Sequence, residues 1–150
     1  MAGNRIGKGL DEVYSEAILD HARSPRHKDQ IERPDGAGDA VNPFCGDEAH
    51  VQLSSDGAGI VDLGMQTVGC SINRAAGSMI AEKLCGVSLE EAGSLASDYR
   101  RLMAGQELAG DRREALGKLV LMETVRLFPV RIKCALLSLT AVEEALTFKR

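Results

Sequence analysis

Alternating apolar and polar residues predict a β-hairpin in the first half of the chain. Val51 and Leu53 alternate with polar neighbours over residues 50–55, and the same alternation returns over residues 61–67. Between the two runs, Asp56-Gly57-Ala58-Gly59 has the composition of a tight turn. Residues 39–42 add a short strand that Pro43 ends. We therefore expect a small three-stranded antiparallel sheet.

Helical periodicity accounts for most of the remaining chain. Apolar residues recur at intervals of three and four in five segments: 10–21, 71–84, 88–105, 111–127 and 129–146. Ser24-Pro25 stops the first segment, Ser88 opens the third with a capping box, and Pro129 opens the last. The order of helix, sheet and then a run of helices predicts an α+β fold, with an N-terminal helix and the later helices packed on one face of the sheet.

Length and composition set limits on the class of protein. A chain of 150 residues is expected to form one domain, 1–150, with residues 1–9 as a flexible tail. The net charge of -4 and an aromatic content of only 3% argue against a nucleic-acid surface with stacking platforms. No apolar run is long enough for a membrane span, and the N-terminus lacks the apolar segment of an export signal. We expect a cytoplasmic protein, whose thiols are reduced or metal-bound.

Three cysteines and one aspartate form a candidate metal site. Asp47 and Cys70 lie roughly ten residues before and after the hairpin turn, so antiparallel pairing brings both to its open end. Cys70 precedes one predicted helix and Cys134 falls in the first turn of another, where the helix dipole lowers a thiol pKa. Cys45 lies on a loop bounded by proline and glycine. Three sulfur ligands and one carboxylate suit tetrahedral Zn²⁺.

The remaining cysteine and the histidines receive simpler interpretations. Cys85 ends the helix that Cys70 begins, about 22 Å away at 1.5 Å per residue, and is expected to be an ordinary small buried residue. His21 lies on an apolar stripe and is expected to be buried. His27 and His50 lack metal-ligand spacing and are expected to be solvated.

Several motifs together resemble the SufU/IscU family, which is also called NifU N-terminal-like. The similarity extends from about Leu10 to Leu146 and rests on Ile18-Leu19-Asp20-His21, Ser24-Pro25-Arg26, Asn42-Pro43-Phe44-Cys45-Gly46-Asp47, Gly69-Cys70-Ser71-Ile72 and Phe128-Pro129-Val130-Arg131-Ile132-Lys133-Cys134. The resemblance implies a role in iron–sulfur cluster assembly. Members of the family are either cluster scaffolds or zinc-dependent acceptors of persulfide sulfur from a cysteine desulfurase.

Departures from the scaffold pattern favour the SufU branch. Scaffolds of the IscU type carry histidine immediately before the last cysteine, where this chain has Lys133, and the chaperone-binding Leu-Pro-Pro-Val-Lys segment is absent. The resemblance then implies a zinc-dependent sulfurtransferase that accepts sulfur on Cys45. Its partners would be a SufS-type desulfurase and downstream cluster-assembly proteins. Two alternatives stay open: a scaffold with a labile [2Fe-2S] cluster, and a non-catalytic adaptor stabilised by zinc.

Two cations near the last cysteine complete the expected site. Arg131 and Lys133 fall near the start of the last predicted helix, where positive charge opposes the helix dipole and calls for an anionic neighbour. We expect Arg131 to orient or neutralise Cys45 or the incoming persulfide, and so to act with Cys45 in catalysis.

Overall fold

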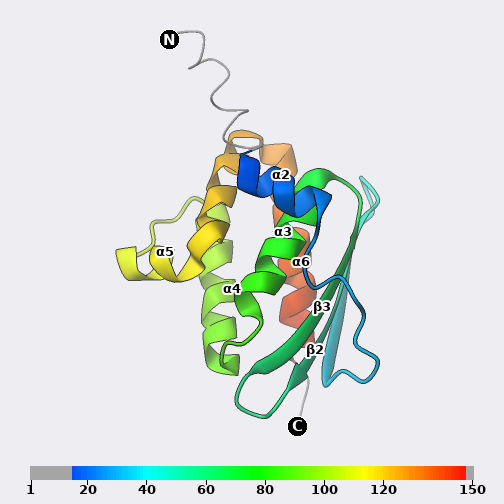
Figure 1. The fold of residues 1–150 in the computed structure, drawn as a ribbon. Coiled ribbons are helices and arrows are strands. Elements are labelled where there is room, and N and C mark those ends of the chain that lie inside the picture. The colour runs from blue at the N-terminus through cyan, green and yellow to red at the C-terminus, as the bar shows by residue number, and fades with distance from the viewer. Residues whose placement is uncertain (1–14, 148–150) are drawn as a thin grey trace, which may run out of the picture.

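A computed structural model describes residues 15–147 and shows a sheet covered by helices on one face (Figure 1). The expected tail at residues 1–9 and the first part of the predicted N-terminal helix lie outside this range. The elements in chain order are α2 (Glu16–Arg23), β1 (Gly36–Asn42), β2 (Asp47–Ser55), β3 (Ile60–Val68), α3 (Ser71–Leu84), α4 (Leu89–Met103), α5 (Gly110–Leu116), the 3₁₀ helix η1 (Gly117–Leu127) and α6 (Pro129–Ala145). The α+β architecture is therefore confirmed. Within residues 15–147, no helix has both the length and the apolar character needed to cross a bilayer.

The sheet is antiparallel throughout and has the order β1-β2-β3. Strands β2 and β3 form the predicted hairpin, in which Val51 pairs with Met65 and Leu53 with Leu63. Strand β1 is longer than expected, because the glycine-rich start that looks like a loop in sequence belongs to the strand. A Cβ at Gly38 would lie 1.9 Å from the Ala141 carbonyl oxygen of α6, so only glycine allows this close approach of helix and strand.

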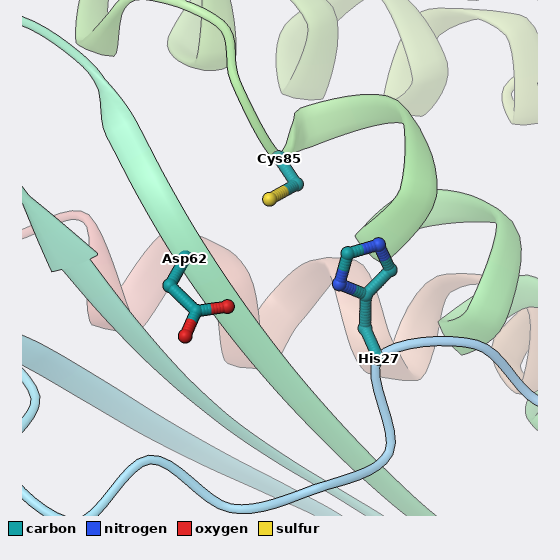
Figure 2. A group of neighbouring side chains, drawn as sticks. All are labelled: His27, Asp62 and Cys85. Carbon is teal, nitrogen blue, oxygen red and sulfur yellow. The ribbon is translucent and has the colours of Figure 1, made fainter.

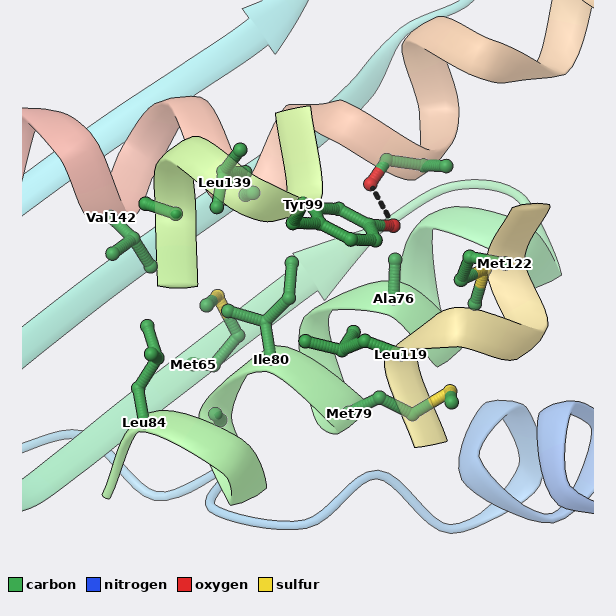
Figure 3. Packing of buried hydrophobic residues seen from close by; sticks show 14 of the residues in the cluster. Met65, Ala76, Met79, Ile80, Leu84, Tyr99, Leu119, Met122, Leu139 and Val142 are labelled. Atoms are coloured by element: carbon green, nitrogen blue, oxygen red, sulfur yellow. Dashed lines mark hydrogen bonds between the residues drawn. The ribbon is translucent and has the colours of Figure 1, made fainter. Parts of the chain in front are cut away.

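The hydrophobic core lies between the sheet and the helices that cover it. Helices α3 and α6 pack on the strands, and α4 and η1 pack on those two helices (Figures 1 and 3). Tyr99 of α4 is fully buried in this layer, and its hydroxyl donates a hydrogen bond to the Ala135 carbonyl oxygen at 2.9 Å (Figure 3). This bond satisfies the one polar atom of a large core side chain and joins α4 to α6 close to Cys134.

The segment predicted as one helix over residues 111–127 is divided in the structure. Helix α5 ends at Leu116 and η1 begins at Gly117, which has φ 57° and ψ -130°. A residue in that conformation cannot continue a right-handed helix, and glycine adopts it without the steric cost of a Cβ. The prediction of a single helix was wrong because apolar periodicity continued across the break.

His21 is buried, as its place on an apolar stripe predicted. Its side chain is 1% exposed, and its Nδ1 lies 2.7 Å from the Ser78 hydroxyl. That hydroxyl oxygen also accepts a hydrogen bond from the backbone N–H of Arg26 at 2.8 Å. The hydroxyl of Ser78 thus joins the buried imidazole to the backbone of the loop that follows α2.

The stability of the fold should decrease in mild acid because of His21. Burial lowers the pKa of His21 below 6.5; nearby Arg26 and Lys118 lower it further, whereas Glu82 and Asp20 oppose the change. A lowered folded-state pKa means that the unfolded chain binds the proton first, so stability is complete above about pH 6.5 and falls as the pH drops toward the folded pKa. Each unit of pKa difference removes about 1.4 kcal/mol.

Urea unfolding between about pH 8 and about pH 5 measures this effect. His21→Gln, which does not titrate, should unfold with a shallower pH dependence than the unchanged protein. Equal slopes for the two proteins would show that His21 does not contribute.

Candidate metal centre

Cys45 lies at the tip of the turn that joins β1 to β2. The turn is tight: Asn42 pairs with Asp47 across its base, and the Gly46 N–H donates to the Asn42 carbonyl oxygen at 2.8 Å. Gly46 has φ 79°, a conformation that favours glycine. The segment that the sequence indicated as a loop is thus a hairpin turn, and it presents Cys45 with an exposed side chain.

Asp47 follows at the first position of β2, with its side chain only 3% exposed. One carboxylate oxygen, Oδ1, accepts the backbone N–H of Cys70 at 3.1 Å, and Oδ2 lies 3.3 Å from the Cys70 sulfur, whose thiol donates to it. A Cβ at Gly69 would lie 1.9 Å from Oδ1, and Gly69 has φ 124°. Glycine therefore leaves the space that the Asp47 carboxylate fills.

Cys70 is the N-cap residue of α3, as predicted. Asn73, in the first turn of the same helix, is fully buried and donates through its Nδ2 to the carbonyl oxygens of Glu48 at 3.0 Å and Val68 at 3.1 Å. This amide fixes the open end of the β2–β3 hairpin against the helix. Asn73 was not predicted from the sequence, although a polar residue within an apolar helical stripe was the available signal.

Cys134 of α6 is the last of the candidate ligands. Its Sγ, the Cys45 Sγ and an Asp47 oxygen all lie within 4.8 Å of one another. Cys134 is the sixth residue of α6, which begins at Pro129, so it lies in the second turn and not in the first as expected. The helix dipole acts mainly within the first turn. Burial first, and then the neighbouring Cys70 and Asp47 side chains, instead raise the pKa of the Cys134 thiol to about 12.

The chemistry of this donor set fits a zinc ion. Zn–S bonds of about 2.3 Å and Zn–O bonds of about 2.0–2.2 Å place the ligands of a tetrahedral site roughly 3.3–3.8 Å apart. The ligand atoms of Cys45, Asp47 and Cys134 lie within 4.8 Å of one another. The Cys70 sulfur lies 3.3 Å from Asp47 Oδ2 but outside that group of three, so a four-ligand site requires the thiols to move closer together. Several acidic groups crowded in a buried place cost free energy when they ionise, and a dication compensates that cost. Cys45, Asp47, Cys70 and Cys134 would hold the ion.

A cavity of about 580 Å³ opens beside the exposed sulfur of Cys45. Arg131 and Lys133 of α6 line it together with Phe44 and Cys45 of the turn. The Lys133 ammonium lies 5.9 Å from the centre of the Phe44 ring, within range of a cation–π contact. Lys133 is thus placed over the residue that precedes Cys45, a contact between distant segments that the sequence pattern did not reveal.

The other cysteine and two of the histidines depart from their expected settings. Cys85 is half-buried, and His27, also half-buried, lies near it with Asp62. His50 is not simply solvated: its Nδ1 lies 2.6 Å from an Asp39 oxygen and its Nε2 lies 3.0 Å from a Glu48 oxygen. The hydrogen bond with Asp39, and to a smaller extent the one with Glu48, raises the pKa of His50.

Comparison with known proteins assigns the chain to a family. The NifU-like N terminal domain matches residues 13–147. The chain therefore belongs to the NifU-like N-terminal domain family, which includes the SufU and IscU proteins of iron–sulfur cluster assembly. The resemblance drawn from the motifs is confirmed.

The relatives of this chain include a protein described as a sulfurtransferase and proteins described as cluster scaffolds. The zinc-dependent sulfurtransferase SufU of Bacillus subtilis is 35% identical over 135 residues, which cover 90% of each chain. The scaffold protein IscU of Streptococcus pyogenes is 34% identical over 137 residues, covering 91% of this chain and 84% of that one. The crystal structure of a candidate scaffold protein for the SUF system of Fervidobacterium islandicum superposes with a TM-score of 0.84 at 29% identity, covering 91% of this chain and 98% of that one.

Proposed function

We propose that the chain is a zinc-dependent sulfurtransferase that accepts persulfide sulfur on Cys45 from a cysteine desulfurase. The observation that carries this proposal is the asymmetry of the donor set. Cys45 is exposed at the tip of a turn, whereas Asp47 and Cys134 are 3% and 5% exposed. One donor can therefore meet a second protein while the others stay in place. The similarity to SufU of Bacillus subtilis supports the same role.

The proposed transfer is a thiol exchange at sulfur. The Cys45 thiolate attacks the outer sulfur of the desulfurase persulfide, the S–S bond to the desulfurase cysteine breaks, and that cysteine leaves as a thiolate. Cys45 then carries the persulfide, and the process needs no oxidant or reductant. When bound, zinc would keep the donor thiols deprotonated near neutral pH, which suits this chemistry and a reducing compartment such as the cytoplasm.

Lys133 supports this function over a cluster scaffold. Within the resemblance, the scaffold branch has a histidine at this position, which could bind a metal or cluster. A lysine ammonium is a poor metal ligand while protonated, because it has donors and no acceptor. In this chain Lys133 contacts Phe44 and lines the cavity, where its charge would attract an anionic persulfide.

Exposed apolar side chains surround the candidate site and would meet the desulfurase. The two most exposed are Phe44 at 91% and Val130 at 82%, on either side of the cavity. The apolar rim comprises these two residues together with Phe128, which is 37% exposed and precedes Pro129 of the cavity lining. Apolar side chains around a charged centre are typical of a protein-binding surface.

Replacing Val130 by aspartate should weaken desulfurase binding about tenfold, since a contact at the centre of an interface contributes about 1–2 kcal/mol. Val130 is exposed, so the fold and the zinc content should not change. Val61→Asp is the matched control, because Val61 is 56% exposed on β3 next to the opposite hairpin turn. Calorimetry measures the affinity of each variant for the desulfurase. Equal affinities for the two variants would reject the apolar rim as the docking surface.

Arg131→Ala should slow sulfur transfer about tenfold while zinc content stays the same. Arg131 lines the cavity beside Cys45, and its loss removes a positive charge that would stabilise the anionic sulfur during transfer. Arg131→Lys keeps that charge and should recover part of the rate. A normal rate in the alanine variant, measured as desulfurase turnover, would remove Arg131 from the mechanism.

Metal and acid-labile sulfide analysis tests the proposed function at its first step. Tag-free protein purified without chelator should be colourless, with one tightly bound zinc per chain and no sulfide. Addition of this protein should increase the turnover of a SufS-type desulfurase. Iron with matching sulfide and a brown colour would instead favour the scaffold function, and zinc without stimulation would favour an adaptor.

A further inference from the structure

A second group of metal-ligand types lies at the far end of α3 from Cys70. Figure 2 shows His27, Asp62 and Cys85 turned toward a common space. Their ligand atoms, a ring nitrogen, a carboxylate oxygen and a thiol sulfur, all lie within 4.8 Å of one another. They come from the loop after α2, from strand β3 and from the C-cap of α3. No predicted function of the chain uses them.

Hydrogen bonds with backbone groups hold all three residues in place. The His27 carbonyl oxygen accepts the Met65 N–H at 2.6 Å, which ties the loop to the edge of β3. The Cys85 N–H donates to the Ala81 carbonyl oxygen at 3.1 Å, and the Leu63 N–H donates to Asp62 Oδ1 at 2.9 Å. The three donors are therefore carried by ordered backbone, although they are distant in sequence.

The three side chains face one another without bonding directly. Among the hydrogen bonds and ion pairs found in residues 15–147, none joins His27, Asp62 and Cys85 to each other, although imidazole, carboxylate and thiol could all pair. A nucleophile–base–acid triad would need such bonds. Burial also raises the pKa of the Cys85 thiol, which is unfavourable for a nucleophile. Separations slightly longer than a hydrogen bond leave room for an ion.

We propose that His27, Asp62 and Cys85 form a second metal site, separate from the candidate centre at Cys45, for a divalent transition ion of the Zn²⁺ type. Sulfur, nitrogen and oxygen ligands together suit a borderline ion, and not Mg²⁺ or Ca²⁺, which prefer oxygen alone. A thiolate and a carboxylate neutralise the dication, and the thiol proton passes to solvent on binding. Because Asp62 is exposed, water completes the coordination.

The two sites should fill independently. The fourteen residues of α3 span about 21 Å at 1.5 Å per residue, and the two sites lie at its opposite ends. With three protein ligands and an exposed face, the second site should bind more weakly than the four-ligand centre. It should therefore be lost on purification and regained when metal is added.

Titration of metal-free protein with Co²⁺ tests this inference, because thiolate–cobalt absorption reports cysteine coordination. By equilibrium dialysis the unchanged protein should bind two equivalents, and Cys85→Ser should bind one. Asp62→Asn alters an exposed side chain and should weaken only the second equivalent, about tenfold or more. Asp29→Asn is the matched control, since it removes an exposed carboxylate from the loop that carries His27 and should bind as the unchanged protein does.

The reciprocal variant separates this inference from the proposed function. Cys134→Ser should lose the first equivalent and keep the absorption that depends on Cys85. Two equivalents in both Cys85→Ser and Asp62→Asn, with unchanged absorption, would overturn the second site while leaving the proposed sulfurtransferase untouched. Circular dichroism confirms that each variant is folded.

Discussion

Cys45→Ser is expected to abolish sulfur acceptance. A serine hydroxyl at this position is not ionised near neutral pH and is a far weaker nucleophile than a thiolate, so no persulfide can form there. Desulfurase turnover in the presence of this variant should fall to the rate of the desulfurase alone, a loss of about 100-fold or more in transfer. The side chain is exposed at a hairpin tip, so the fold should be unaffected.

Cys85→Ser is the control for this experiment. It removes another cysteine of the chain, which lies at the other end of α3 from Cys70, and should leave transfer to Cys45 unchanged. Desulfurase stimulation that persists in Cys45→Ser would assign the acceptor role to another thiol and reject the mechanism.

Asp47→Ala is expected to release the zinc and to destabilise the fold. The substitution removes one of four ligands, which should lower zinc affinity by more than the roughly 10–100-fold that supporting contacts contribute. It also leaves the Cys70 N–H without its 3.1 Å partner in a partly buried place, at a cost of about 1 kcal/mol. The zinc-free Asp47→Ala protein should therefore melt at a lower temperature than the zinc-free unchanged protein.

Zinc analysis and thermal unfolding measure the two effects separately. Glu48→Ala is the matched control, because Glu48 is the next residue of β2 and its side chain is half-exposed on the opposite face. It should retain zinc. An Asp47→Ala protein with full zinc content would show that the carboxylate is not a ligand.

Local signals in the sequence predicted the parts of the site that depend on one hairpin. Antiparallel pairing about a recognisable turn made Asp47 and Cys70 neighbours, and the helical periodicity of residues 71–84 placed Cys70 at the start of α3. These inferences succeeded because strand alternation and helical periodicity are local patterns in the sequence. Membership in the family then supported the whole fold.

Features that depend on distant packing could not be predicted in this way. The environment of Cys134 was misjudged, since burial against Cys70 and Asp47 exceeds any effect of the helix dipole in the second turn. The contact of Lys133 with Phe44 and the gathering of His27 with Cys85 join segments that no local pattern connects. Periodicity likewise hid the break at Gly117, whose backbone conformation ends α5.

Direct detection of a persulfide on Cys45 tests the central claim. The zinc-loaded chain is incubated with a SufS-type desulfurase and cysteine, alkylated and digested, and each cysteine peptide is analysed by mass spectrometry. One additional sulfur atom is expected on the peptide that contains Cys45, and none on those that contain Cys85 or Cys134. Additional sulfur on another cysteine with Cys45 unmodified, or on no peptide while the desulfurase turns over, would contradict it.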